Sequence, residues 1–519
     1  MPTACNRSAC LSAAHIAAGA WLLGLLLPAT AGAQLSQPFW SSYGRDAQHS
    51  AQSTVAGQPL TRIRWQTAID LHPQYVDNDL LIHYGSPLLT QADTIIVPTK
   101  VGVTDRFRLD GRRTSDGKLR WRQQTNYRPP PHDWMPSFSP VLSATGKLWV
   151  PAGGGTVLYR TRIDVRGGRT NRVAFYGTRS YRTHRRAYLE HVFINTPLTA
   201  DATGNIFFGF QVTGATPTGL QSGIARITDS GLGFSVSAAT AAADGGITKV
   251  AHNSAPALSN DGSIVYVAVN NGDGRGSGVG YLLALNSQTL ATVAAARLKD
   301  PVSGNDANVH DDATSSPSVG PDGDVYFGVL ENPFPSNNDR GWLLHFDAML
   351  NPKGAPGAFG WDDTATVVPA TMVPSYAGAS AYLLMTKYNN YAGIGSGDGI
   401  NRLAILDPND QMTDPISGAT VMREVLTIVG VTPDSAAGPS FPGAVREWCI
   451  NNAVVDAPSK SIVANSEDGK LYRWDMTTNT LSETLVLTPG IGEAYTPTLI
   501  GPDGTVYAIN NATLFAVGQ

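Results

Sequence analysis

The sequence predicts an all-β protein, folded as one eight-bladed β-propeller. Three observations support this class: a repeated sequence phrase, a spacing between its copies that suits one blade each, and a last copy that lacks a strand. In each copy a small or polar residue precedes Pro, an apolar strand follows, and a tight Asx/Gly turn leads into a second strand ending in aromatic or β-branched residues. The clearest copies begin at Pro197, Pro256, Pro317 and Pro497.

Weaker copies extend the repeat along the chain, with spacings of 53, 57, 59, 61, 57, 79 and 44 residues. Each interval has room for four short strands, as is typical of radially repeated sheets. The copies are anchored at Pro87, Pro140, Pro197, Pro256, Pro317, Pro374, Ala453 and Pro497. These anchors predict eight blades in a single domain.

The turns and the chain end support a closed ring. Asn260-Asp-Gly262 and Pro502-Asp-Gly504 place Gly where a positive φ is required and Asx where a side chain can bond the backbone. After Tyr507 only one strand remains, Thr513 to Val517, so the last blade lacks its outer strand. The alternating segment at about residues 60–70 has no partner of its own. We expect it to join the last blade and remove an open edge.

Several of these segments resemble a known family, the pyrroloquinoline-quinone-like propellers, which are relatives of the quinoprotein alcohol dehydrogenases. The resemblance rests on the Pro-x9-Tyr strand pairs, on third strands at Leu282–Leu285 and Leu343–Asp347, and on the turn before Trp121 in Thr114–Trp121. It covers nearly all of the mature chain. It implies the propeller fold, an oxidoreductase activity and a quinone beneath a vicinal disulfide, although many similar propellers only bind or scaffold.

The cysteine content argues against that quinone. The chain has three cysteines, and Cys5 and Cys10 precede the expected cleavage site, so Cys449 is alone in the mature protein. The vicinal disulfide that the resemblance implies is therefore missing, and so is a Cys-x-x-Cys-His haem motif. A standard quinoprotein dehydrogenase is not expected, and a transition metal is the other cofactor that the sequence suggests.

The N-terminus predicts export to the periplasm or the extracellular space. Arg7, an apolar run over residues 16–27 and the small residues Ala31-Gly-Ala33 together form a signal peptide over residues 1–33. The propeller then occupies residues 34–519. No later stretch is long and apolar enough to span a bilayer, and an uncleaved anchor is the alternative to cleavage.

Positive charge is concentrated in one part of the chain. Lys100–Arg186 holds 19 Lys or Arg against five Asp, although the whole chain has a net charge of −4. This sector suits an anionic partner such as an acidic polysaccharide or a lipid headgroup. The alternative is a solvated surface whose charges balance a neighbour. Nucleic acid is not expected, because the exported chain contains no recognisable binding module.

Polar side chains lead into the innermost strands, on the face that also carries the long loops Gly272–Gly278, Glu331–Asp339 and Lys387–Gly399. Because innermost strands surround the axis, we expect these side chains to converge. The candidate ligands of a transition metal are His83, His191, His252, His310, Glu447, Glu493 and Asp312. The candidates for binding a small anionic substrate are Lys387, Arg275, Tyr84, Tyr495 and Asn253. Alternatively, these groups line a water-filled channel.

Other kinds of site find less support. Gly272–Gly278 is not followed by a helix signature and so is not a nucleotide phosphate loop. Asp273 and Asp398 lack the terminal acidic ligand of a calcium loop, which favours flexible polar loops. No Gly-x-Ser-x-Gly elbow indicates a serine hydrolase.

Two classes of function remain. The first is an exported propeller that binds a ligand in an axial site on the long-loop face, as an oxidoreductase or a metal-dependent lyase if it is an enzyme. The second is a non-catalytic propeller that binds a partner, or acts as a scaffold, through its basic sector. We favour the axial ligand site without assigning turnover.

Overall fold

The structure, a computed structural model, describes residues 37–519 except 77–78, 82–84, 104–105, 133–137, 275, 277, 312–314, 491 and 493. The predicted signal peptide lies outside the described residues. So do five candidate site residues, namely His83, Tyr84, Arg275, Asp312 and Glu493.

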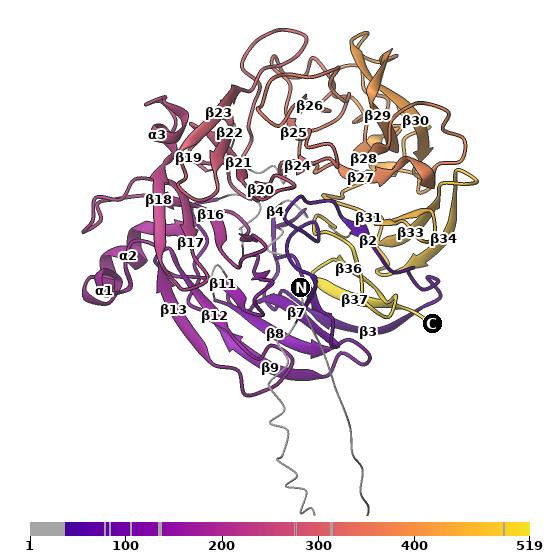
Figure 1. The fold of residues 1–519 in the computed structure, drawn as a ribbon. Coiled ribbons are helices and arrows are strands. Elements are labelled where there is room, and N and C mark those ends of the chain that lie inside the picture. The colour runs from indigo at the N-terminus through magenta and orange to yellow at the C-terminus, as the bar shows by residue number, and fades with distance from the viewer. Residues whose placement is uncertain are drawn as a thin grey trace, which may run out of the picture. The chain divides into compact units, whose positions relative to one another are not determined.

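Eight antiparallel blades follow one another around a common centre, which confirms the predicted eight-bladed propeller (Figure 1). Blade one consists of β1 (Pro38–Trp40), β6 (Leu88–Thr90), β7 (Thr94–Lys100), β8 (Phe107–Arg113) and β9 (Leu119–Gln124). Blade two consists of β10 (Val141–Leu142), β11 (Leu148–Ala152), β12 (Thr156–Arg160) and β13 (Thr170–Ala174). Blade three consists of β14 (Val192–Ile194), β15 (Thr199–Ala200), β16 (Ile206–Val212), β17 (Gly223–Ile227) and β18 (Gly233–Ser237).

The next three blades repeat this arrangement. Blade four consists of β19 (Lys249–Val250), β20 (Ala257–Leu258), β21 (Ile264–Asn270), β22 (Gly280–Asn286) and β23 (Thr292–Arg297). Blade five consists of β24 (Ser318–Val319), β25 (Val325–Val329) and β26 (Trp342–Phe346). Blade six consists of β27 (Thr366–Pro369), β28 (Tyr382–Tyr388), β29 (Arg402–Thr413) and β30 (Thr420–Val429).

The last two blades each take a strand from the N-terminal part of the propeller. Blade seven consists of β2 (Gln52–Ser53), β31 (Val454–Asp456), β32 (Ser461–Asn465), β33 (Lys470–Asp475) and β34 (Thr480–Val486). Blade eight consists of β3 (Arg62–Ala68), β35 (Leu499–Ile500), β36 (Val506–Asn510) and β37 (Thr513–Gly518). Because β3 pairs with β37 from Arg62 opposite Gly518 to Ala68 opposite Thr513, the predicted closure of the ring is confirmed.

The repeat was misread at two blades. The innermost strand of blade six is β27, so the anchor at Pro374 was placed too late in the sequence. A long connection with the 3-10 helix η1 (Ala370–Met372) follows β27, where the repeat predicts a tight turn. Blade five has a three-stranded sheet instead of the expected four, and only single bridges at Gly357 and Pro352 cover the outer edge of β26.

The N-terminal segment of residues 41–51 runs through the centre of the ring, an arrangement that the sequence did not predict. Backbone N–H groups from the innermost strands of five blades donate to its carbonyl groups, at N···O distances of 2.7 to 3.3 Å. The donors are Leu142, Leu258, Val319, Val367 and Val455. Here we call this segment the axial plug.

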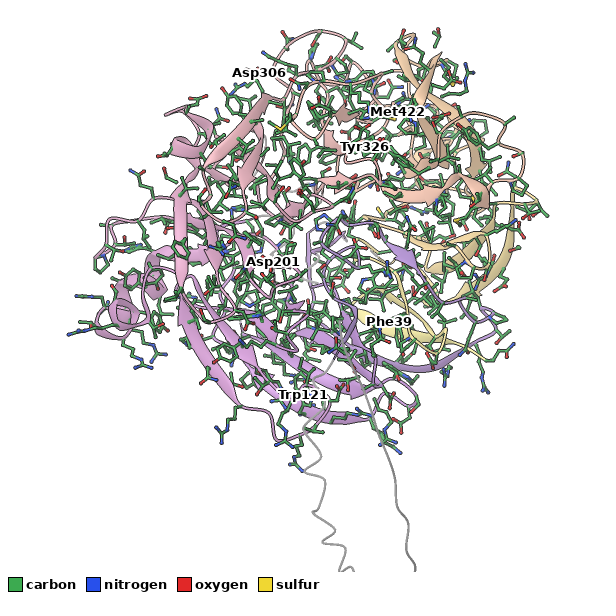
Figure 2. The ribbon with its side chains drawn as sticks, in the orientation of Figure 1. Phe39, Trp121, Asp201, Asp306, Tyr326 and Met422 are labelled. Carbon is green, nitrogen blue, oxygen red and sulfur yellow. The ribbon has the colours of Figure 1, made fainter. Side chains whose placement is uncertain are left out.

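Side chains fill the space between neighbouring sheets, as Figure 2 shows around Trp121 and Tyr326. Both are buried, and they belong to separate apolar clusters that each join several blades. Three short helices, α1 (Thr178–Thr183), α2 (Arg185–His191) and α3 (Ala238–Ala242), lie in connections between strands. A hairpin of β4 (Gln74–Val76) with β5 (Asp79–Leu81) and the 3-10 helix η2 (Ser435–Ala437) complete the described elements. Within the described ranges, no helix has the length and apolar character needed to cross a membrane.

Candidate functional site

A pocket of about 500 Å³ lies where connections from blades five to eight meet. It is bounded by the β25–β26 loop, the segment before β27, the β28–β29 loop, the segments on either side of η2, and the β32–β33 turn. Its charged and aromatic lining residues are Asp339, Trp361, Asp362, Tyr391, Asp434, Arg446, Glu447, Glu467 and Tyr495. Five carboxylates therefore face one arginine in the described lining.

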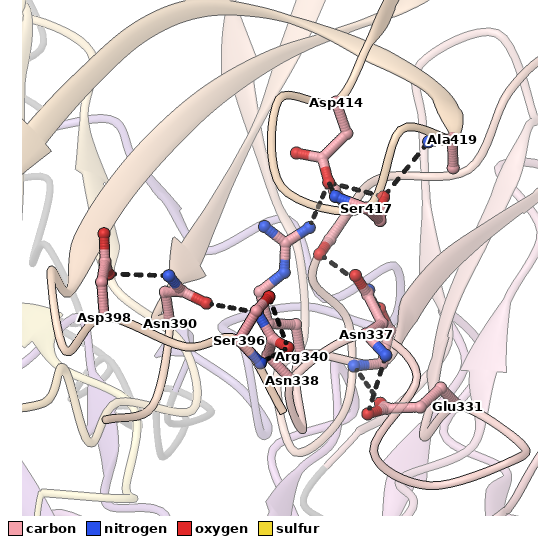
Figure 3. A network of polar contacts seen from close by, with 12 residues as sticks. Glu331, Asn337, Asn338, Arg340, Asn390, Ser396, Asp398, Asp414, Ser417 and Ala419 are labelled. Atoms are coloured by element: carbon pink, nitrogen blue, oxygen red, sulfur yellow. Dashed lines mark hydrogen bonds and ion pairs between the residues drawn. The ribbon is translucent and has the colours of Figure 1, made fainter. Parts of the chain in front are cut away.

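Hydrogen bonds hold the β25–β26 loop in one conformation (Figure 3). The carboxylate of Glu331, which is fully buried, accepts from the backbone N–H groups of Asp339 at 2.7 Å and Gly341 at 2.8 Å. The adjacent Arg340 donates to Asp414 at 2.8 Å, and both side chains are fully buried. Such charge-assisted bonds are stronger than neutral ones and resist opening of the loop.

Hydrogen bonds also connect the β25–β26 loop to the β28–β29 loop, beside the pocket. Asn338 donates to Asn390 at 2.9 Å, and Asn390 donates to Asp398 at 2.7 Å (Figure 3). Ser396 accepts a further bond from Asn338 at 3.2 Å. Two of the long loops that the sequence placed on the working face therefore form one rigid wall.

Blade seven supplies a group of potential metal ligands. One ligand atom from each of Glu447, Cys449 and Glu467 lies within 4.8 Å of the others. The Sγ atom of Cys449 is 3.5 Å from Glu467 and 4.0 Å from Glu447. It is also 3.4 Å from the hydroxyl of Tyr495. This is the one group of at least three such side chains found in the part of the chain that the structure describes.

Burial changes the protonation of the carboxyl groups in the pocket. The pKa of Glu447 rises to about 8, because the group is buried and lies beside Glu467. The pKa of Asp339 rises to about 7, first through burial and then through the charges of Glu331 and Asp362. Both groups therefore exchange protons near neutral pH, where an ordinary carboxyl group is fully ionised.

Lys387 lies beside this pocket, but it is already paired. Its Nζ is 2.5 Å from the carboxylate of Asp362, and both side chains are buried. The ammonium group also lies 5.3 Å from the ring centre of Tyr495, within the range of a cation–π contact. Burial lowers the pKa of Lys387, but the charges of Asp362, Cys449 and Asp363 together outweigh burial, and the pKa is raised. The surplus of carboxylates favours a cationic ligand over the anionic substrate expected from the sequence.

Two of the candidate histidines come together in another place. His252 and His310 line a small cavity of about 10 Å³ together with Trp361. Neither ring nitrogen of His252 has a hydrogen-bond partner among the described residues. Burial and, after it, the charge of Lys249 lower the pKa of His252 to about 3. The cavity has the volume of about one water molecule.

The remaining candidates are spread over the ring. His191 is the last residue of α2, before blade three, and its ring packs against Gly214. Asn253 is buried and its backbone N–H donates to Asn195 at 3.0 Å. Metal binding by the histidines stays a prediction, because the structure brings together only His252 and His310 of the three that it describes.

Sequence reasoning missed Glu467, Asp339, Asp362 and Trp361. Asp362 precedes β27 much as His252 precedes β20, but the misplaced anchor at Pro374 hid this equivalence. Glu467 lies in the β32–β33 turn, at the end of the blade that carries the long loops. These residues could therefore have been found from their position in the blade repeat, whereas the residues next to them in the sequence provided no such indication.

The pocket does not fit the quinone that the fold family implies. Pyrroloquinoline quinone carries three carboxylates and needs cationic partners, whereas five carboxylates line this pocket. The one lining arginine, Arg446, already pairs with Asp434 at 3.2 Å. Cys449 is a buried free thiol and so forms no disulfide above the pocket. Carboxylate and thiolate donors suit a metal ion instead.

Comparison with known proteins supports the fold. A europium-containing methanol dehydrogenase is 10% identical, with a TM-score of 0.53, over 92% of this chain and 90% of its own. A quinohemoprotein alcohol dehydrogenase from Comamonas testosteroni is 12% identical, with a TM-score of 0.53, over 94% of this chain and 82% of its own. No family model matches the sequence, and no curated protein matches it. The chain therefore has the eight-bladed fold of the pyrroloquinoline-quinone-like propellers, as the sequence resemblance predicted.

Proposed function

We propose that this protein binds a zinc-class transition metal ion through Glu447, Cys449 and Glu467 and uses it to hold a ligand in the adjoining pocket. The observation that carries the proposal is the close approach of the three donors. A tetrahedral zinc ion separates a thiolate and a carboxylate ligand by about 3.6 Å, given bonds of about 2.3 and 2.1 Å. The Sγ of Cys449 and the nearest carboxylate oxygen of Glu467 are already 3.5 Å apart.

The number of protein ligands favours a working metal over a structural one. Structural zinc sites are closed by four side chains, whereas catalytic sites keep three and leave one position for water or substrate. Here two of the three ligands, Glu447 and Glu467, line a pocket of about 500 Å³, which supplies that open position. An ion there would act as a Lewis acid on the bound ligand. The oxidoreductase class implied by the resemblance stays a prediction, because the dehydrogenases share only the fold.

Metal binding can be tested with the purified mature protein. We expect about one equivalent of Zn²⁺ or Co²⁺, and a thiolate-to-cobalt charge-transfer absorption that disappears in Cys449→Ser. Glu467→Gln should weaken binding strongly, whereas Glu190→Gln on the exposed face of α2 serves as the matched control. Failure to bind metal, or stoichiometric cobalt binding without a thiolate band, would refute this ligand set.

A second candidate function, docking to an anionic partner, is supported by the arginines of the Arg160–Arg186 segment. Earlier basic residues of the sector pair with aspartates, as Arg108 and Arg112 do with Asp110. Six exposed arginines of the segment have no ion pair among the described residues. They are Arg162, Arg166, Arg169, Arg179, Arg182 and Arg185. We infer that this surface, rather than the whole sector, binds an acidic polymer or surface.

We also propose that the protein works in the periplasm or outside the cell. The support is the N-terminal sequence alone, with its basic residue, apolar run and small-residue cleavage site. Amino-terminal sequencing of the protein recovered from the periplasm or the culture medium would test this. An intact Met1 would contradict cleavage of the signal peptide.

A further inference from the structure

We propose that the pocket selects a small organic cation, a primary amine that carries an apolar or aromatic group, with its ammonium group held by Asp339. The inference rests on the proposed function and names the ligand class of that same site. Three features of the pocket lead to it: the balance of charge, the position of Asp339, and the aromatic wall.

The charge balance leaves one carboxylate without a counter-charge. Asp362 pairs with Lys387 at 2.5 Å, and Asp434 pairs with Arg446 at 3.2 Å. Glu447 and Glu467 are the proposed metal ligands. The carboxylate of Asp339 has no hydrogen bond or ion pair within the described ranges, and it is only partly exposed.

A bound divalent ion does not remove the surplus of negative charge. The five lining carboxylates and a metal-bound thiolate together outweigh the divalent ion, Arg446 and Lys387. An anionic ligand would therefore be repelled, and a cation would be attracted. Burial of an unpaired carboxylate is costly, and a ligand ammonium group would offset that cost.

Asp339 is held in place before any ligand arrives. Its φ is 62°, a left-handed conformation that is unusual for a residue other than glycine. The bond from its N–H to the buried Glu331 maintains that conformation, and the neighbouring residues Asn338 and Arg340 are each anchored by their own side chains. Strained residues persist where the surrounding structure over-determines them, and they are frequent at ligand sites. The backbone that carries this carboxylate is therefore already ordered, and only the side-chain torsions of Asp339 lose freedom on binding.

The rest of the lining suits the apolar part of an amine. Trp361 and Tyr391 lie on the wall with Asp339, and Ile394 and Ala392 add aliphatic surface. Aromatic faces attract an adjacent ammonium group, and Lys387 already makes such a contact with Tyr495. A volume of about 500 Å³ lies within the usual range for small-molecule sites.

The test compares three probes of similar shape on the zinc-loaded protein: 2-phenylethylamine, 2-phenylethanol and 3-phenylpropionate. We expect calorimetry to show that the amine binds at least about tenfold more tightly than the alcohol, and that the carboxylate binds most weakly. Asp339→Asn should remove most of the preference for the amine while keeping the zinc content. Asp410→Asn, on the exposed edge of blade six, is the matched control and should behave as the wild type.

The outcomes separate this inference from the proposed function. One equivalent of zinc with equal affinity for amine and alcohol would overturn the amine inference and leave metal binding intact. Loss of zinc in Asp339→Asn would overturn it as well, because Asp339 would then be a metal ligand. Selective amine binding that depends on Asp339 in a protein that binds no zinc would support the inference and refute the metal site.

Discussion

The raised pKa of Glu447 predicts that zinc binding weakens steeply between pH 8 and pH 6. A carboxyl group must lose its proton to become a metal ligand, so metal competes with protons below the pKa of that group. The pKa of Glu447 is about 8, because of its burial and the adjacent Glu467. A carboxyl group with an ordinary pKa of about 4.3 would be ionised throughout this range and would leave the affinity unchanged.

The size of the effect follows from the same value. Each pH unit below the pKa costs about 1.36 kcal/mol, a factor of ten in affinity. Glu447 is half ionised at pH 8 and about 1% ionised at pH 6, so between these two values this group alone weakens binding by about 50-fold, or about 2.3 kcal/mol. The thiol of Cys449 must also lose its proton, so the wild-type protein is expected to lose at least this much.

The assay is a zinc titration against a fluorescent chelator that has been calibrated at pH 6, 7 and 8. Cys449→Ser removes the thiol proton, so the slope that remains in this variant belongs to the carboxylates. Calorimetry in two buffers of different ionisation enthalpy gives an independent count of protons released per ion at pH 7. If the zinc affinity of Cys449→Ser changes by less than about threefold between pH 6 and pH 8, the argument from the buried carboxyl group is refuted.

Three further predictions concern stability and the basic surface. His252 has a folded pKa of about 3 against about 6.5 unfolded, so its contribution to stability is complete above pH 6.5 and is lost as the pH falls. At pH 4.5 the loss of unfolding free energy due to this group is about 2.7 kcal/mol. In denaturant unfolding, His252→Gln should therefore lose less unfolding free energy on acidification than the wild type or the control His184→Gln. Trp40 is fully buried next to the axial plug, so Trp40→Ala should lower the unfolding free energy by about 3–5 kcal/mol. An unchanged denaturation midpoint would show that this part of the chain does not stabilise the propeller. Reversing Arg182 and Arg185 to Glu should reduce retention on an anionic matrix at low salt, where exposed charges act over about 10 Å or more, and equal retention of both proteins would exclude a binding surface there.

Local sequence determined the blades, because the information that forms a β-hairpin is local. Short apolar runs define the inner strands, and Asx-Gly turns define their connections, so seven of the eight innermost strands could be located from the anchors. The unpaired strand at residues 62–68 could be matched to the last blade for the same reason, since both lacked a partner. Blade six failed because a 3-10 helix replaces its first turn and Pro374 imitates an anchor.

The candidate site was only partly visible in the sequence. Glu447 and Tyr495 were identified as polar residues near innermost strands and Lys387 as the start of a long loop, and the structure places all three at or beside the pocket. Glu467 and Asp339 were not identified, because each lies in a loop, where the direction of a side chain depends on contacts that the sequence pattern does not reveal. For Asp339 that direction is decided by the buried carboxylate of Glu331.

Only the tertiary structure decided that the axial plug occupies the centre of the ring and that four blades share one acidic pocket. A polar segment such as residues 41–51 carries no strand periodicity, and its backbone is satisfied only when the innermost strands of several blades surround it. Likewise, carboxylates far apart in the chain raise one another's pKa only after the ring has closed and excluded water from between them. The repeat thus determined the scaffold, whereas the convergence of its loops determined the chemistry of the site.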